Sequence, residues 1–482
     1  MAGSVADGVA DVVLRWFQAS VVCQKKHPST EWTVLAGIVA HSTAGEDPSA
    51  AGAESAFRML ACATGTKCLG RRDLDTRGLV VNDCHAEILA RRALLRFLYT
   101  EALVWTAARE KGDEPPSTSL FERHPTTHRL VLKPQHTLHL YISEAPCGDA
   151  AIYQLRGDII DELVKQRVER NADTGERPST TEAAAAIGAV AEDTHERSAF
   201  RLTGAKAKRK HSDETTASSS PNENAQRPPE KRFDQMVGIA RVKSGRSDLP
   251  PDKQTLSMSC SDKLAKWNAV GIQGTLLLQW YEPLFLRSIV VSRDDTCVST
   301  AAQYEALERA ICGRFKESSW LQQRSGDKEG ALLPTCALHI VAREFPRKKP
   351  PTAAADSARK VPSSLALNWS THMAHWHSTI ASETLYDTSH HFVAAADTQH
   401  GVRLATLLKK FFQTQDVEVL MAATGLKQGA KRLSKMTDIE TQRVASRIAK
   451  WTFFLVFRHI VAMESALDDA DAGQHTHTEQ EH

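Results

Sequence analysis

The chain has 482 residues, of which 41% are hydrophobic and 24% charged, and its net charge is only +2. This composition predicts a soluble globular protein of two or three domains, or one large domain with insertions, and the charge does not by itself demand a nucleic-acid partner. No apolar run approaches the roughly 18 residues of a membrane span, and Asp7 and Asp11 argue against a signal peptide. Nine scattered cysteines argue against a disulfide scaffold. We therefore expect an intracellular protein, in the nucleus or the cytoplasm, that has free thiols.

The predicted elements mix helices and strands along the whole chain. Apolar periodicity predicts helices over 5–24, 84–103, 148–164, 301–316, 402–413 and 440–462. Strand composition appears over 31–40, 136–143, 276–282 and 287–292. Residues 167–233 are expected to form a low-complexity insertion, and residues 463–482 a disordered acidic tail. An α/β domain with insertions is the simplest arrangement, and two independent domains are the alternative.

The helix predicted at 84–103 starts with His85-Ala86-Glu87. His-x-Glu alone is a weak signal, because 20 histidines in a chain rich in glutamate should produce about one match by chance. Asn82 or Asp83 can cap the helix that begins here. A side chain in the first turn lies at the positive end of the helix dipole, which favours hydroxide on a nearby metal ion. Position therefore makes this match a candidate site.

Two further segments contain cysteines that could bind the same metal. In "LYISEAPCGDAAIYQL" (140–155), Cys147 follows a predicted strand and opens the helix predicted at 148–164, and a helix N-terminus lowers thiol pKa values. Base deaminases that use zinc combine His-x-Glu with Pro-Cys-x-x-Cys, but no second cysteine follows here. Either the site is inactive or the third ligand comes from elsewhere. Cys260, in "SMSCSDKLAKWNAVGIQGTLL" (257–277), precedes Ser261 and Asp262, either of which can cap a helix.

These segments together resemble one known family. "NDCHAEILARR", "ISEAPCGDA" and the segment around Cys260 are similar to the adenosine-to-inosine deaminase domain shared by messenger-RNA editing adenosine deaminases and the tRNA-specific adenosine deaminase. In that family the two cysteines are far apart in sequence, which resolves the broken signature. The resemblance implies one large domain over 1–462 with the cytidine-deaminase-like α/β fold, a mixed sheet with helices on both faces.

The resemblance also implies the chemistry. His85, Cys147 and Cys260 would hold one zinc ion, with water as the fourth ligand, and three protein ligands with one open position is the catalytic pattern. Zinc lowers the pKa of its water from about 15.7 to about 7. Glu87 would take a proton from this water, which attacks C6 of adenine, and would then protonate the departing amine. The products are inosine and ammonia.

The substrate residues implied by the family point to tRNA. In "TGTKC" (64–68), Thr66 would contact the ribose hydroxyl and Lys67 a phosphate. Arg246, in "RVKSGRSD" (241–248), stands where the messenger-RNA editors carry an acidic residue, so this loop looks more like that of the tRNA enzyme. We expect deamination of tRNA at position 37, next to the anticodon of alanine tRNA, with tRNA as the partner and no membrane or obligate protein partner. The alternatives are a deaminase of messenger or double-stranded RNA and a catalytically silent RNA-binding scaffold.

Arg91 and Arg92 lie on helical stripes that are otherwise largely apolar. Taken alone, such arginines most often snorkel or pair with buried carboxylates. In the family, this pair binds inositol hexakisphosphate enclosed in the core, and further basic or polar residues match its other ligands. These matching residues are Lys263, Lys266, Thr275 and Lys427. The family's C-terminal segment of spaced Tyr, Lys and Trp ligands has no counterpart here, so the chain is either truncated, a divergent version with a smaller cage, or the product of an imperfect gene model.

Overall fold

The computed structural model describes residues 4–43, 56–114, 116–161, 237–243, 250–315, 336–350, 360–386 and 398–479. Its centre is one eight-stranded sheet with the strand order β10-β9-β8-β2-β3-β12-β13-β14. These strands are β2 (Leu35–Ser42), β3 (Phe57–Thr64), β8 (His136–Ile142), β9 (Ser288–Ser292), β10 (Ala337–Val341), β12 (Leu365–Ser370), β13 (Glu418–Met421) and β14 (Leu426–Lys427). Strands β8, β9 and β10 are parallel and the other neighbours are antiparallel. The sheet is therefore mixed, as predicted.

Three two-stranded sheets accompany the central one. They pair β1 (Glu31–Trp32) with β11 (Val361–Pro362), β4 (Thr66–Cys68) with β5 (Asp83–His85), and β6 (Phe121–Arg123) with β7 (Leu130–Leu132). No helix in the described part of the chain is both long and apolar enough to cross a membrane.

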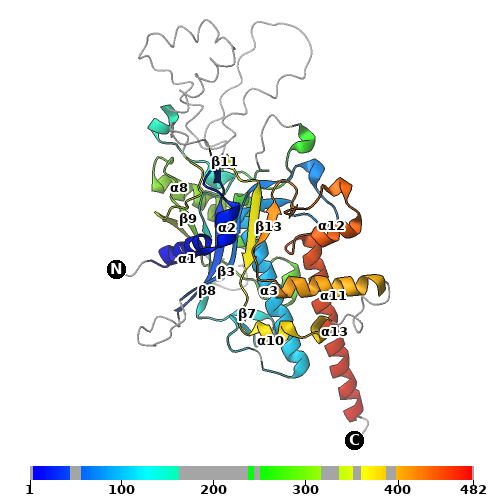
Figure 1. Cartoon of the computed structure of the whole chain (residues 1–482). Coiled ribbons are helices and arrows are strands. Elements are labelled where there is room, and N and C mark those ends of the chain that lie inside the picture. The colour runs from blue at the N-terminus through cyan, green and yellow to red at the C-terminus, as the bar shows by residue number, and fades with distance from the viewer. Residues whose placement is uncertain are drawn as a thin grey trace, which may run out of the picture.

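Helices cover both faces of the central sheet (Figure 1). On one face, α1 (Val5–Ala19) packs against alternate sheet residues such as Leu35 and Val39. On the other face, α3 (Ala86–Lys111) packs against the intervening residues, such as Ala36 and Ile38. Because side chains alternate across a strand, β2 contributes to two separate cores. The predicted cytidine-deaminase-like α/β class, with helices on both faces, is confirmed.

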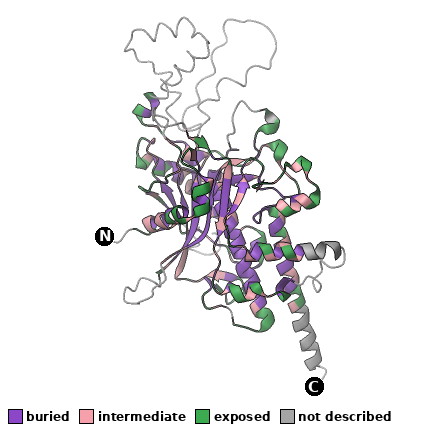
Figure 2. Cartoon of the chain, viewed as in Figure 1, coloured by how far each residue is buried: buried purple, intermediate pink, exposed green. Residues whose placement is uncertain are grey.

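Helix α3 is buried along most of its length (Figure 2). It contacts β2, β3 and β12 of the sheet, and α10 (Trp376–Ala381) and α13 (Lys450–Glu479) pack on its other sides. Burial from several directions explains why the sequence of this helix is apolar around most of its circumference. The polar groups that α3 carries therefore need partners inside the protein.

Two predicted helices are each divided into two. Residues 5–24 form α1 and α2 (Val21–Lys26), because Ser20 leaves the helical conformation and its side chain caps α2 by accepting from the Cys23 amide. Residues 440–462 fall into α12 (Asp438–Val444) and α13. Other described helical segments include α7 (Cys260–Val270), α8 (Thr300–Leu307), the π-helix η7 (Glu308–Cys312), the 3₁₀ turn η8 (Gly313–Phe315) and α11 (Thr398–Gln413).

The helix predicted at 148–164 is wrong over its first half. Only a 3₁₀ turn, η3 (Asp149–Ala151), follows Cys147, and Leu155 then forms a β-bridge with Cys297. Arg309 donates hydrogen bonds to the carbonyl oxygens of Asp149 and Ile152. In a continuous helix, these oxygens would have accepted from backbone amides of the helix itself. Gly148, at φ +110°, lets the chain pass so close to α7 that a Cβ would lie 2.3 Å from Ser259 Oγ.

The strand predicted at 276–282 is also wrong. Residues Leu276–Gln279 form a 3₁₀ turn, η6, and the aromatic residues after it pack on helices. Trp280 donates from Nε1 to Glu464 of α13, and Tyr281 donates from its hydroxyl to the Leu98 carbonyl of α3. Tertiary packing thus overrides the strand propensity of this run.

The predicted tail and insertion have different outcomes. Helix α13 runs to Glu479, so the prediction of a disordered tail over 463–482 disagrees with the structure. The helix begins on an apolar stripe that includes Phe453, Val456 and Ile460, and the Ala, Leu and Glu residues that follow favour its continuation. The predicted insertion at 167–233 lies outside the described residues.

Candidate metal centre and active site

Three potential metal ligands from separate segments converge. His85 ends β5, Cys147 follows β8, and Cys260 is the first residue of α7. One ligand atom of each residue lies within 4.8 Å of those of the other two. Within the described part of the chain, this is the only group of three or more His, Cys, Asp or Glu residues that meets this criterion. The structure thus brings together the three residues predicted to bind metal.

The local structure that presents His85 differs from the prediction. Asn82 and Asp83 do not cap α3, because Asp83–His85 forms β5 and His85 itself occupies the N-cap position. Strand β5 pairs with β4 so that Thr66 lies opposite His85. At α7, Ser259 is the N-cap and accepts from the Asp262 amide, so the predicted caps Ser261 and Asp262 are also wrong.

Asp83 orients His85. Its Oδ1 is 2.9 Å from His85 Nδ1 and accepts from Lys243 Nζ at 3.0 Å, while Oδ2 accepts from Ser257 Oγ and Lys263 Nζ. Although burial raises it, these positive partners hold the pKa of Asp83 well below its ordinary value. An ionised carboxylate on Nδ1 leaves Nε2 of the imidazole for a metal, and metal-binding histidines usually bond a carboxylate or carbonyl through the other ring nitrogen in this way. Sequence reasoning missed this role, for which the signal was an Asp two residues before the histidine.

Lys243 is a buried cation beside the cysteine sulfurs. Its side chain is 3% exposed, and its Nζ lies 2.8 Å from Cys260 Sγ. The hydrogen bond from Cys260, together with the charges of Lys243 and His85, holds the pKa of Cys147 well below its ordinary value. Burial and Lys243 lower the pKa of His85, but bonds to Asp83 and Cys147 prevail and raise it to about 9.

This donor set fits zinc. One imidazole nitrogen and two sulfurs, one of them favoured as a thiolate, are the ligand types that zinc prefers. Metal binding would release the proton of the His85 imidazolium and that of the Cys260 thiol, whose pKa burial raises well above its ordinary value. Lys243 lies in "RVKSGRSD" (241–248), the segment that contains the predicted substrate residue Arg246. Sequence reasoning missed the contact of Lys243 with the metal centre, because a lone lysine gives no signal for it.

Glu87 lies in the first turn of α3 and is 3% exposed. Burial is the main cause of the raised pKa of Cys260, and the negative charge of Glu87 adds to it. Glu87 is therefore close enough to the metal ligands to act on them electrostatically. Burial also raises the pKa of Glu144 to about 7, and the charge of Glu87 adds to this effect. Among the described residues, none donates a hydrogen bond to the Glu87 carboxylate. A buried carboxylate beside the ligands and without a fixed donor can exchange a proton with a bound substrate.

The predicted substrate loop adjoins the metal ligands. Thr66 and Lys67 belong to β4, which pairs directly with the strand that contains His85. The Thr66 hydroxyl is buried and has no hydrogen-bond partner among the described residues. Arg246, the third predicted substrate residue, lies outside the described residues.

Gly65 permits the close approach of β4 to β5. It has φ +149°, and a Cβ there would lie 2.0 Å from the Cys84 carbonyl oxygen. We expect Gly65→Ala to destabilise the protein by about 2 kcal/mol or more, because the two strands must separate. Urea unfolding of the variant and of Gly112→Ala, where no atom lies within 4 Å of the added Cβ, would measure this. Equal losses in the two variants would show that positive φ alone, and not strand approach, is responsible.

Arg91 and Arg92 form a second, separate feature of α3. Arg91 donates to the Ile272 carbonyl at 2.7 Å and Arg92 to the Ile448 carbonyl at 2.6 Å. Their guanidinium groups lie over the rings of Trp267 and Phe453. Burial lowers their pKa values to about 9 and about 10, and no carboxylate of a described residue is within ion-pair distance of either. Two adjacent half-buried cations without an acid favour an added anion.

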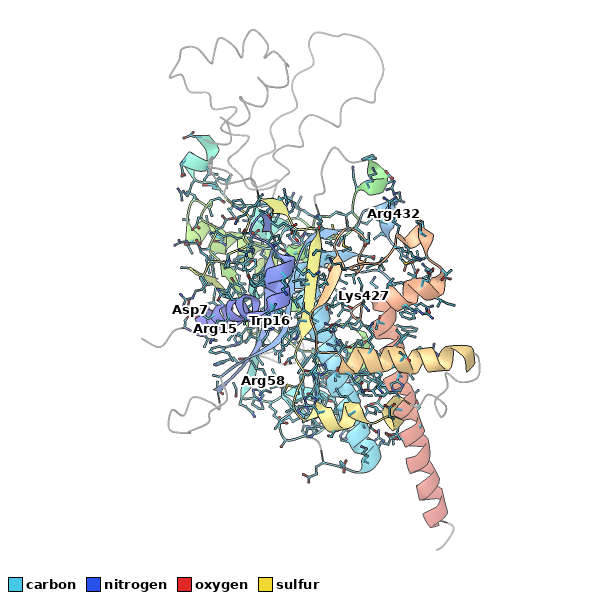
Figure 3. All side chains as sticks on the ribbon, viewed as in Figure 1. Asp7, Arg15, Trp16, Arg58, Lys427 and Arg432 are labelled. Atoms are coloured by element: carbon cyan, nitrogen blue, oxygen red, sulfur yellow. The ribbon has the colours of Figure 1, made fainter. Side chains whose placement is uncertain are left out.

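The other residues predicted for this anion are less closely grouped. Lys263 bonds to Asp83 of the metal centre, and Lys266 and Thr275 are exposed. Lys427, on β14 at the edge of the sheet (Figure 3), lies 3.4 Å from Glu418. Arg92 and Glu418 contact the same segment, since Glu418 accepts from Ser446 and Arg447 just before the Ile448 carbonyl.

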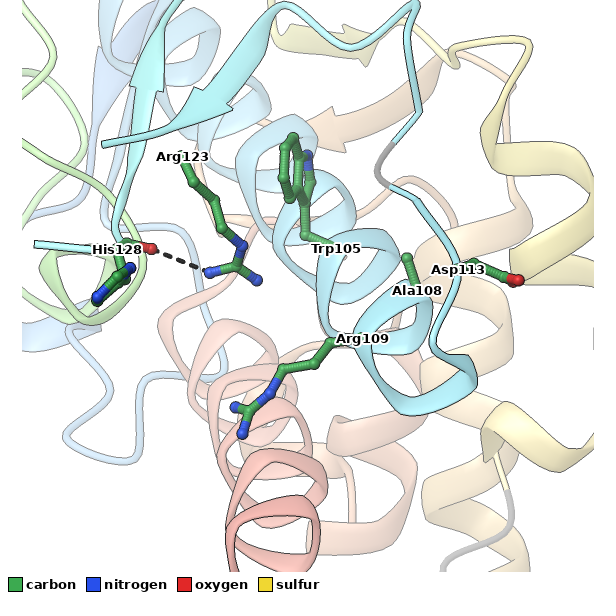
Figure 4. A pocket seen from close by; sticks show the side chains of 6 residues that line it. All are labelled: Trp105, Ala108, Arg109, Asp113, Arg123 and His128. Carbon is green, nitrogen blue, oxygen red and sulfur yellow. Dashed lines mark hydrogen bonds between the residues drawn. The ribbon is translucent and has the colours of Figure 1, made fainter. Parts of the chain in front are cut away.

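A pocket of about 520 Å³ lies at the opposite end of α3 (Figure 4). It is lined by Trp105, Ala108, Arg109, Asp113, Arg123 and His128. The 22 residues of α3 between Glu87 and Arg109 correspond to about 33 Å at 1.5 Å per residue. This pocket is therefore distinct from the metal centre.

Comparison with known proteins identifies related sequences. Residues 61–414 match the family model described as the adenosine-deaminase (editase) domain. The tRNA-specific adenosine deaminase 1 of Drosophila melanogaster is 31% identical over 322 residues, which are 66% of this chain and 62% of that protein. The protein of the same name from Homo sapiens is 28% identical over 72% of this chain and 75% of its own length. The double-stranded RNA-specific editase Adar of Drosophila melanogaster is 28% identical over 65% of this chain and 36% of its own length.

Proposed function

The chain belongs to the adenosine-deaminase (editase) domain family, and from this premise we propose that it converts adenosine to inosine in tRNA, using zinc held by His85, Cys147 and Cys260. The observation that carries the proposal is the convergence of these three ligands beside the buried carboxylate of Glu87. On this view residues 1–462 form one deaminase domain.

The residues around the centre divide the chemistry among them. When bound, zinc would lower the pKa of a water molecule from about 15.7 to about 7, which makes hydroxide available at neutral pH. Glu87 accepts the proton of the attacking water and returns it to the amine that leaves C6 of adenine. Asp83 holds His85 in one orientation, and Lys243 offsets the negative charge of the thiolates. Because these donors and charges are fixed before the reaction, little reorganisation is needed.

The strand that pairs with the His85 segment would hold the nucleotide. The buried, unpartnered hydroxyl of Thr66 suits a ribose hydroxyl, and Lys67 on the same strand would meet a phosphate. Arg246, in the segment 241–248, would contact the flipped nucleotide as well. A base must leave its stack to reach such a buried centre, and single-stranded loops of RNA lose the least energy when this happens.

The extent of the matches supports tRNA as the substrate. The relatives named tRNA-specific adenosine deaminase 1 match over 62% and 75% of their own lengths, whereas the double-stranded RNA-specific editase matches over 36%. We propose the adenosine at position 37 of alanine tRNA, next to the anticodon.

A direct comparison of substrates tests this proposal. We expect the purified protein to form inosine in alanine tRNA at position 37 and to act at least tenfold more slowly on a duplex RNA of similar length. Sequencing of the RNA after reverse transcription would report both products, because inosine is read as guanosine. Faster reaction of the duplex would favour a double-stranded RNA deaminase, and zinc binding without either product would favour a silent RNA-binding scaffold.

We further propose that Arg91 and Arg92 bind inositol hexakisphosphate. Two half-buried guanidinium groups without an acidic partner among the described residues support a polyanion there, and Lys263 would connect it to Asp83 of the metal centre. Lys266, Thr275 and Lys427 would add further contacts to the polyanion, and Lys427 would first have to break its ion pair with Glu418.

We expect mass spectrometry of the purified, denatured protein to detect one inositol hexakisphosphate per chain. The Arg91→Ala, Arg92→Ala double variant should lose it. Wild-type protein that unfolds cooperatively and releases no inositol phosphate would contradict this proposal.

A further inference from the structure

Both cysteines of the proposed metal centre are followed, two residues later, by an aspartate. The sequence reads Cys-Gly-Asp at 147–149 and Cys-Ser-Asp at 260–262, and the two cysteines are 113 residues apart. Asp149 is fully buried and the side chain of Asp262 is 9% exposed. Buried carboxylates require partners. Asp149 pairs with Arg309, whose Nε lies 3.3 Å from Oδ2, and among the described residues one further arginine pairs with both Asp149 and Asp262.

That partner is Arg314, in the 3₁₀ turn η8 that follows the π-helix η7. Its Nη2 lies 3.6 Å from Asp149 Oδ2, and its Nη1 forms an ion pair with Asp262 Oδ1. The side chain is only 12% exposed. A guanidinium group is planar with donors on both sides, so it can bind two carboxylates at once, whereas an ammonium group acts as a single point charge.

The two cysteine segments also meet through neutral hydrogen bonds. Ser261 donates from Oγ to the Cys147 carbonyl at 3.0 Å and accepts from the Ala150 amide at 3.1 Å. The Cys260 amide donates to Cys147 Sγ at 3.4 Å. The loop after Cys147 has little regular structure of its own, because η3 contains only three residues. The spacing of the two sulfurs therefore depends on contacts between segments.

We infer that Arg314 is a positioning residue, which sets the spacing of the Cys147 and Cys260 sulfurs by binding the aspartate that follows each cysteine. This inference rests on the zinc site proposed above. The third ligand, His85, arrives on a separate strand and is oriented by Asp83. Arg314 thus acts on the two sulfurs alone, and its effect is on metal affinity. Removing such a partner of metal ligands weakens metal binding by about 10- to 100-fold.

The test compares zinc affinity with the stability of the metal-free protein in the full chain. Zinc dissociation constants would be measured by competition with a chromophoric chelator, and unfolding midpoints by thermal denaturation after metal removal. We expect Arg314→Ala to weaken zinc binding by about 10- to 100-fold. Arg314→Lys, which keeps the charge but cannot bind both carboxylates, should fold normally and still bind zinc several-fold more weakly. Arg293→Ala is the matched control, because Arg293 pairs with Asp295 on the surface.

The outcomes separate the two proposals. Wild-type protein that binds no zinc would overturn the metal centre and this inference together. Wild-type affinity in Arg314→Lys, or an equal loss in Arg293→Ala, would overturn the inference and leave the metal centre standing. If Arg314→Ala fails to fold, the Arg314→Lys result decides the question alone. Support requires a loss of zinc affinity in a variant whose metal-free midpoint stays at that of wild type.

Discussion

Glu87→Ala is expected to reduce the rate of adenosine deamination by at least about 10²- to 10⁴-fold, the usual contribution of a general acid and base, while one zinc ion stays bound. Glu87 is not one of the three converging ligands, so its loss leaves the metal site complete. Inosine formation in tRNA and metal analysis of the same preparation would measure the two effects. Because the carboxylate is 3% exposed and has no donor among the described residues, the variant should be as stable as wild type, or more so.

Two other variants define the role of Glu87. Glu87→Gln keeps the shape and the hydrogen bonds but cannot carry the proton, so it should be as inactive as Glu87→Ala. Glu110→Ala changes an exposed residue near the other end of the same helix and should react like wild type. Undiminished deamination by Glu87→Ala would show that another group moves the proton. Loss of zinc from this variant would show that Glu87 supports the metal instead.

Cys147→Ala is expected to lower the zinc content from one ion per chain to near zero and to reduce activity to background. Two remaining protein ligands are fewer than the three that a catalytic zinc site requires. Metal analysis after dialysis, followed by an inosine assay with and without added zinc, would show both losses. Removing zinc from the wild-type protein with a chelator should have the same effect, and added zinc should restore only the wild type.

Cys68→Ala is the matched control for Cys147→Ala. Cys68 is a half-buried free thiol on β4, opposite Asp83 of β5, and it does not belong to the converging group. Its variant should retain zinc and activity. If Cys147→Ala still bound one zinc ion tightly, a different residue would have to supply the third ligand. A similar loss in both variants would mean that the region responds to any change of packing.

Much of the reactive centre can be predicted from residue types and their order. Zinc prefers nitrogen and sulfur donors, and His85, Cys147 and Cys260 carry these wherever the chain places them. The prediction of a helix that bears Glu87 in its first turn succeeded because the apolar pattern of α3 is long. Short elements were harder to predict, since the strand expected at 276–282 is a 3₁₀ turn whose aromatic residues bind distant helices.

Residue types and their order are enough to predict which side chains could bind zinc and which could move a proton, and the apolar pattern predicts which helix is buried. The partners of these residues depend on contacts between distant segments. Asp83 could have capped a helix, but it orients His85, because β4 draws its segment into a strand. Lys243 and Arg314 gave no local signal, because a cation shows its role only when folding carries a buried anion to it. Covalent neighbours set the properties of a residue, but its electrostatic partners come from segments brought close by packing.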